Sequence, residues 1–109
     1  MERMNDAFLD NDWGDGYPLV PPTPERVQAM LSGTTLKPHE VVCMLPPGNG
    51  FATVEKIAIN AVMAGCNPQH LPVLIAAAKA ISQMERRAVR GLLVSTSAGA
   101  PLMLINGPI

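Results

Sequence analysis

The pattern of apolar and polar positions predicts a first helix from about Pro24 to Ser32, ending at Gly33. Thr23 can cap a free amide at its start, and Pro24 fits the first helical position. Glu25 lies in the first turn, where a carboxylate favours the positive end of the helix. The apolar face of this helix is made by Val27, Met30 and Leu31.

Two further helices are predicted in the middle of the chain. One runs from Val54 to about Gly65 after the capping residue Thr53, and we expect it to be buried because it is apolar on nearly every side. The other begins at Pro68, with Asn67 as its cap, and runs to about Met84. Pro72 must distort its first turns, since proline has no amide hydrogen to donate.

Three apolar runs predict strands, at 40–45, 91–96 and 101–105. The first is nearly continuous in apolar and β-branched residues and is followed by two prolines, as expected for a strand buried on both faces. The order of helices and strands fits an α/β class with packed helices and a small sheet, which could be mixed. We expect one domain over 15–109, preceded by a polar N-terminal arm over 1–14 that has no sustained periodicity.

The composition indicates that the fold is completed by another chain. Charged residues make up 16% of the 109 residues, against roughly 25% in an average soluble domain, while hydrophobic residues reach 48%. A small domain needs proportionally more polar surface, so a second polypeptide is expected to cover part of this one. The chain also stops soon after an apolar run, which suggests that the rest of the fold is a separate chain. A core unusually rich in alanine and methionine is the alternative.

Charge and apolar patterning exclude several classes of function. The net charge is -1 and the pI is about 6.0, so we expect no binding to nucleic acid or to an anionic membrane. The N-terminus does not resemble a signal peptide, and the nearly uncharged stretch 57–78 is divided by residues 65–68 into parts too short to span a bilayer. The chain is therefore expected in the cytoplasm, with Cys43 and Cys66 as free thiols.

Three segments resemble a bacterial family related to UGSC-type (seleno)proteins. They are Asp15-Gly-Tyr-Pro-Leu-Val-Pro-Pro-Thr23 and the runs 53–66 and 100–109, and the likeness extends over most of the chain. The resemblance implies that this chain corresponds to the N-terminal part of longer members. The family's redox motif, a cysteine or selenocysteine followed by Gly-Ser-Cys, is not present, because Cys43 precedes methionine and Cys66 precedes asparagine. The resemblance therefore carries no selenothiol chemistry to this chain.

The candidate binding site is the loop 46–50 together with the start of the helix that follows it. A buried strand that leads into a glycine-containing turn and a capped helix leaves free amides at a positive helix end, where a carboxylate or phosphate can bind. This arrangement predicts Asn49, Gly50 and Thr53 as substrate-binding residues. The lysine and spacing of a P-loop are absent, so an ordinary strand-to-helix turn is the alternative.

Ionisable and polar side chains follow within that helix. Lys56 and Asn60 lie four residues apart on one face, and Glu55 lies on the adjacent face. On so apolar a helix these groups need partners, since an unpaired buried charge is costly, and we predict that they line a cleft as catalytic residues. The alternative is a solvated first turn, with Asn60 bonded to a neighbouring chain.

Three other positions are secondary candidates. Tyr17 lies in a proline-rich loop and Ser97 follows a predicted strand, where α/β sheets usually hold ligands, so both are expected to contact substrate. For Tyr17 the alternative is a structural hydrogen bond of its hydroxyl. His70 lies four residues after Cys66 and could act as a base for its thiolate. An inert buried thiol is the alternative.

No metal site is expected from the two cysteines and two histidines. His39 and Cys43 would lie about 13 Å apart on a strand, so they could not share one ion with Cys66 and His70.

These observations favour a small subunit of a hetero-oligomeric bacterial enzyme. The chain would contribute a cleft for a small anionic substrate at the interface with a second polypeptide, and redox or lyase chemistry would be compatible with it. The alternative is a non-catalytic structural partner in a larger complex. No motif identifies a cofactor.

Overall fold

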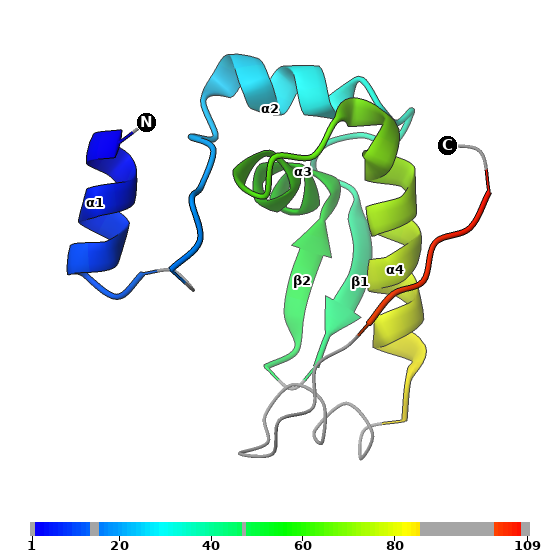
Figure 1. Ribbon diagram of the computed structural model, residues 1–109. Helices are drawn as coiled ribbons and strands as arrows, with labels where there is room; N and C mark the ends of the chain where they lie inside the picture. Colours follow the sequence, from blue (N-terminus) through cyan, green and yellow to red (C-terminus); the bar gives the residue numbers. More distant parts are fainter. Residues whose placement is uncertain (1, 14–15, 47, 86–101, 108–109) are drawn as a thin grey trace.

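The computed structural model describes residues 2–13, 16–46, 48–85 and 102–107. Its elements follow in the order α1 (Glu2–Asp10), α2 (Pro24–Leu31), β1 (Val41–Leu45), β2 (Gly50–Thr53), α3 (Val54–Met63), the short 3₁₀ helix η1 (Pro68–His70) and α4 (Leu71–Gln83), as Figure 1 shows. β1 and β2 form an antiparallel two-stranded sheet. The predicted mixture of helices and strands is confirmed.

The core forms where α2 and α4 pack against α3. The residues that α3 buries recur at three- and four-residue spacing and therefore lie on one side of the helix. They are Val54, Ala58, Ala61 and Val62. α2 adds Val27 and Met30 to this cluster, and α4 adds Leu71 and Ile75. The predicted helices at 24–32 and 54–65 are confirmed, but α3 is buried on one side only.

The helix starts agree with the predicted capping positions, with one difference. Thr53 Oγ1 accepts a hydrogen bond from the backbone N–H of Lys56 (3.3 Å) and so caps α3. At the start of α2 the Thr23 side chain makes no such bond. The pKa of the Glu25 carboxyl lies below its ordinary value. The main cause is a hydrogen bond from the Glu25 backbone, and the second is a hydrogen bond from the Thr23 side chain.

The segment between β1 and α3 is a hairpin, and the predicted direct turn from strand to helix is wrong. Met44 pairs with Phe51 and Leu45 with Gly50, so residues 50–53 form a second strand before α3 begins. In the turn Asn49 adopts a φ of 53°, a left-handed conformation that asparagine tolerates better than most residues. An Asn-Gly pair between two apolar runs is itself a hairpin signal that the sequence reading missed.

β1 is not buried on both faces, and that prediction is also wrong. None of its residues is buried, and Val41 and Met44 are exposed. α4 runs beside β1 in Figure 1 and covers one face of the hairpin, where the Cys43 thiol lies 3.5 Å from the Ala78 carbonyl oxygen. A sheet covered on one side only cannot bury alternate side chains on the other.

The third predicted helix is divided as expected near its prolines. Residues 68–70 form η1, and α4 then begins at Leu71 with Pro72 in its first turn. The backbone N–H of Asn67 donates to Nδ1 of His70 (3.0 Å), which holds the entry to this turn. The predicted distortion by Pro72 is confirmed, and α4 ends at Gln83, close to the predicted Met84.

The N-terminal arm contains a helix, α1, that the sequence reading did not predict. The missed signal is the four-residue spacing of Met4 and Phe8, both of them half-buried. The backbone N–H of Leu19 donates to Asn5 Oδ1 (2.7 Å), which holds the following segment against α1. The next residue, Val20, donates to the Met63 carbonyl oxygen (3.0 Å) and links this segment to the end of α3.

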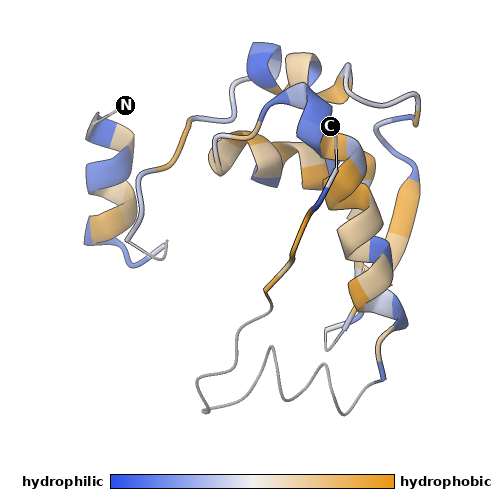
Figure 2. Ribbon diagram, turned by 45° about the vertical axis from the view of Figure 1, so that its right-hand side comes forward, coloured by the Kyte–Doolittle hydropathy of each residue, from blue (hydrophilic) through white to orange (hydrophobic). Residues whose placement is uncertain are grey.

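The predicted C-terminal strands have different outcomes. The run 91–96 lies outside the described residues. Residues 102–105 are described and are not part of a strand, so this prediction is wrong for them. They run as an exposed, largely apolar segment in front of α4 in the view of Figure 2. In the part of the chain that the structure describes, no helix has the length and apolar character needed to cross a bilayer.

Candidate functional site

An open groove of about 610 Å³ lies where α3, α4 and β2 meet. Its walls are largely apolar, and each element supplies one side. β1 and β2 contribute Leu45, Gly50, Phe51 and Ala52. α3 and the residues after it contribute Lys56, Ile57, Asn60, Ala61, Ala64 and Cys66. α4 contributes Leu74, Ala77, Ala78 and Ile81, and Met103 of the C-terminal segment completes the lining.

The α4 wall exists because small residues recur on one side of that helix. Ala77 and Ala78 fill little space between Leu74 and Ile81. Each alanine lies three or four residues from Leu74 and from Ile81, so all four are on one side of the helix. A larger side chain at either alanine would fill the groove. The sequence analysis named no candidate residue on this helix, because an alanine carries no chemical group that marks a site.

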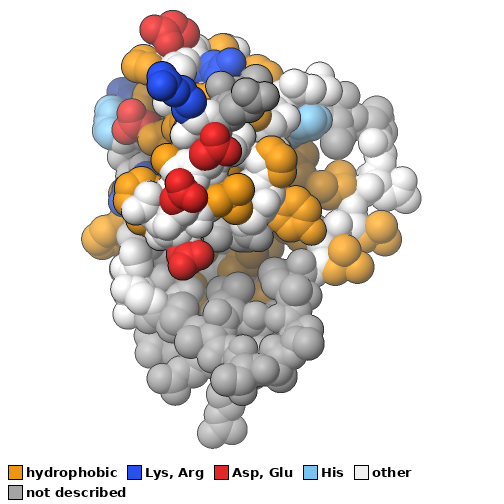
Figure 3. Space-filling model, turned by 60° about the vertical axis from the view of Figure 1, so that its left-hand side comes forward, with side chains coloured by type: hydrophobic (Ala, Val, Ile, Leu, Met, Phe, Trp, Pro, Cys, Tyr) orange, Lys and Arg blue, Asp and Glu red, His pale blue; other side chains and the backbone are white. Residues whose placement is uncertain are grey.

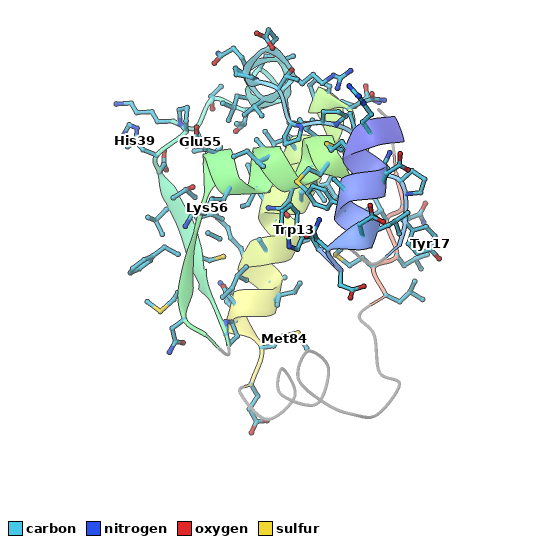
Figure 4. All side chains as sticks on the ribbon, turned by 90° about the vertical axis from the view of Figure 1, so that its left-hand side faces the viewer. Trp13, Tyr17, His39, Glu55, Lys56 and Met84 are labelled. Atoms are coloured by element: carbon cyan, nitrogen blue, oxygen red, sulfur yellow. The ribbon has the colours of Figure 1, made fainter. Side chains whose placement is uncertain are left out.

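Lys56 supplies the positive charge of the groove. Figure 4 shows its side chain at the junction of α3 and the hairpin, and Nζ donates a hydrogen bond to the Phe51 carbonyl oxygen (3.1 Å). An ammonium group has three donors, so two remain for other acceptors. Among the described lining residues the other ionisable group is the Cys66 thiol, which lies just beyond the opposite end of α3.

Asn60 lies one turn after Lys56 on the same side of α3. Its Nδ2 donates to the Lys56 carbonyl oxygen (2.8 Å), so this amide group has a fixed partner within its own helix. The other end of the side chain, Oδ1, remains an acceptor at the groove surface. Lys56 and Asn60 thus place two ammonium donors, one remaining amide N–H donor and the Oδ1 acceptor along one edge of an apolar groove.

The groove collects only part of the predicted catalytic set. Lys56 and Asn60 line it, whereas Glu55 does not. Figure 4 shows Glu55 on the His39 side of the start of α3, away from Lys56. The Glu55 side chain is exposed, and its backbone N–H donates to the Pro38 carbonyl oxygen (2.9 Å). Glu55 therefore does not line this groove with Lys56 and Asn60, as the prediction of one cleft for all three residues required.

The loop 46–50 is not at the start of α3. Figure 1 shows the turn and the start of α3 at opposite ends of β2, so the loop amides cannot act together with the helix end. Gly50 lines the groove from β2, but Asn49 does not. The predicted anion site that joins the loop to the helix start is wrong.

The first amides of α3 are also already bonded. Val54 N–H donates to the Glu40 carbonyl oxygen (3.0 Å), and the next amide, that of Glu55, is held by Pro38. The third is held by Thr53 Oγ1, which explains why Thr53 is a capping residue rather than a substrate ligand. An anion cannot bind these three donors without displacing protein acceptors.

The remaining candidates differ in their positions. Tyr17 is exposed and borders a cavity of about 70 Å³ beside α1, away from the groove. Ser97 lies outside the described residues. Cys66 lines the groove, but Nδ1 of His70 already accepts the Asn67 amide, so that nitrogen is not directed at the thiol. Among the described residues no cluster of three metal-ligating side chains occurs.

Both cysteines are free and half-buried, and they differ in their surroundings. Cys43 contacts the Ala78 carbonyl oxygen between β1 and α4, whereas Cys66 borders the groove. We expect alkylation without reductant to add two labels, with Cys66 reacting first because its thiol borders open space. Intact mass over time measures this order. An unlabelled mass two units light would show a disulfide and overturn the prediction.

Comparisons with protein-family models, curated proteins and solved structures find no match to this chain. Its function must therefore be inferred from the groove itself.

Proposed function

We propose that this chain binds a small anionic molecule with an apolar body in the groove between α3, α4 and β2. The observation that carries the proposal is the groove itself: about 610 Å³, largely apolar, with Lys56 as the cationic side chain among its described lining residues. Small-molecule sites are typically concave, about 300–1,000 Å³ in volume, and lined by apolar groups with few polar ones. The position of Lys56 at one edge gives such a ligand a defined orientation.

Lys56 would contact the anionic group, a carboxylate or a phosphate, through the two ammonium donors that Phe51 leaves unused. Asn60 Oδ1 would accept a hydrogen bond from a hydroxyl or amide next to that group. From Lys56 the groove follows α3 to its end at Met63, seven residues later, which corresponds to about 10 Å along a helix, and it reaches Cys66 beyond that end. The apolar body would lie along this length, against the alanines of α4.

We further propose that the chain is the binding subunit of a cytoplasmic hetero-oligomeric enzyme. Lys56 and Cys66 are the ionisable groups among the described lining residues, and neither has a resolved acid or base partner there. General acid and base groups would then come from a second polypeptide that closes the open side of the groove. The relation of this chain to the UGSC-related family stays a prediction, and isolation of such a complex would test it.

The second candidate is a non-catalytic partner subunit. It is favoured by one observation, the apolar residues that the hairpin leaves exposed on the face opposite α4. Under this function the groove would hold side chains of the partner rather than a free molecule. Binding of a small anion to the isolated chain distinguishes the two functions, because the binding subunit requires such binding and the non-catalytic partner does not.

Titration with dodecanoate and with the neutral analogue dodecanol, both below their aggregation limits, tests the proposal. We expect dodecanoate to bind, and we expect Lys56→Met to lower the affinity for dodecanoate at least about tenfold, since a charge-assisted hydrogen bond contributes roughly 1.5–3 kcal/mol. Dodecanol should bind Lys56→Met and the unmodified chain equally. Calorimetry measures both.

Two further variants serve as controls. Glu55→Gln changes a charge on the same helix outside the groove and should leave both affinities unchanged. Ala77→Phe should fill the groove and abolish binding of both probes. The proposal fails if Ala77→Phe leaves binding of both probes unchanged. It also fails if Lys56→Met and Glu55→Gln lower the affinity for dodecanoate equally.

A further inference from the structure

The outer face of the β1–β2 hairpin is an apolar surface open to solvent. Val41, Met44 and Phe51 remain 52%, 47% and 57% exposed. Met44 and Phe51 are direct cross-strand partners, so their side chains lie on the same face, and Phe51 also borders the groove. The irregularity of the register between Val41 and Cys43 turns Val41 to this face as well.

A second open apolar surface is the segment Leu102, Met103, Leu104 and Ile105. Their exposed fractions alternate, at 94%, 52%, 93% and 54%. This is the two-residue period of a β-strand, in which alternate side chains point to opposite sides. Met103 points to the groove, so Leu102 and Leu104 point away from the molecule. Figure 3 shows that apolar side chains reach the surface among the charged ones on the face drawn there.

We propose that a second copy of this chain covers both surfaces. In a two-fold symmetric dimer, Leu102 and Leu104 of each copy pack on the outer hairpin face of the other copy. Such an interface is reciprocal, because each copy gives one surface and receives the other. The same contact then forms twice, once on each side of the two-fold axis. It covers the outward-facing apolar side chains of both copies.

The area available agrees with what a small dimer interface needs. The five side chains that face outward together expose the equivalent of three to four whole apolar side chains; they are Val41, Met44, Phe51, Leu102 and Leu104. At about 60–120 Å² of apolar area per side chain, this is about 200–400 Å² per copy. The smallest specific interfaces bury about 600 Å² per partner, of which somewhat more than half is non-polar. Either surface alone would be too small.

Charge does not oppose this association. The strands β1 and β2 contain no charged residue, and neither does the segment 102–105. Exposed strands that stay unpaired usually carry lysine, other charges or proline, which make pairing costly. With a net charge of -1, the two copies also repel each other little.

Light scattering after size-exclusion chromatography tests the dimer on the full chain. We expect a mass of about twice 11.6 kDa for the unmodified protein. Leu104→Lys and Met44→Glu should each shift it to the monomer mass. The two exchanges in one chain place Glu against Lys at both contacts, so the double variant should regain the dimer. Circular dichroism checks that each variant is folded, as expected for exposed positions.

Gln28→Lys, on an exposed position of α2, is the matched control and should leave the dimer intact. The proposal is overturned if the unmodified chain is a monomer, or if both single variants remain dimeric. It is also overturned if the double variant stays monomeric, or if the control dissociates too. A mass that keeps rising with concentration would indicate open head-to-tail assembly and would contradict the two-fold dimer.

Discussion

Leu71→Ala is expected to lower the free energy of unfolding by about 2–5 kcal/mol, the range for a fully buried leucine reduced to alanine. Leu71 is 0% exposed and begins α4 in the cluster that joins this helix to α2 and α3. Pro72 follows it directly and restricts the backbone, so the helix start cannot readily move to fill the cavity. A small domain has a total stability of only about 5–15 kcal/mol, so the loss is a large fraction.

Urea unfolding followed by circular dichroism measures this loss. The unmodified protein and the variant are compared at equal chain concentration, since association would add to apparent stability. Leu9→Ala on α1 is the matched control, because that leucine is mostly exposed and should lose well under half as much. A loss below about 1 kcal/mol for Leu71→Ala would show that the α2–α3–α4 cluster is not the core.

Gly33→Ala should also be strongly destabilising, for a reason of space rather than of backbone conformation. A Cβ at Gly33 would lie 2.7 Å from the carbonyl carbon and 3.2 Å from the Cα of Pro68, and it would overlap the Pro68 carbonyl oxygen. All three are backbone atoms at the start of η1, so they cannot rotate away. The end of α2 must separate from η1, at a cost of about 1–3 kcal/mol or more.

Thermal unfolding of Gly33→Ala measures this cost. For a domain of this size each 1 kcal/mol corresponds to roughly 4–8 °C in Tm, so we expect a fall of at least about 5 °C. Gly48→Ala is the control, because a Cβ at Gly48 would meet nothing within 4 Å. Equal melting of the two variants would contradict the close approach of α2 to η1.

The local features of the fold could be predicted from the sequence because their causes lie within a few residues. Thr53 caps α3 through the amide of Lys56, three residues later. Pro72 lies in the first turn of α4, directly after the 3₁₀ turn η1, where a missing amide hydrogen breaks no helical bond. Val27 and Met30 are three residues apart, so their apolar side chains lie on one face of α2, and this face packs on the core.

The hairpin and the exposure of β1 were decided by tertiary structure. An apolar run followed by prolines and glycines suits both a buried strand and one half of a hairpin, and only the pairing of residues 50–53 distinguishes them. That pairing moved the loop away from α3. It also brought Pro38 and Glu40 onto the first amides of α3, which removed the predicted anion site.

Of the candidate site, the sequence by itself determined that Lys56 and Asn60 share one side of α3, because helical spacing requires it. It also determined that this side is polar in an otherwise apolar helix. Tertiary structure alone decided that this side opens into a groove, since the opposite wall, Ala77 and Ala78, comes from another helix. A groove depends on the crossing of elements that lie far apart in the chain, and the pattern within one element does not contain that crossing.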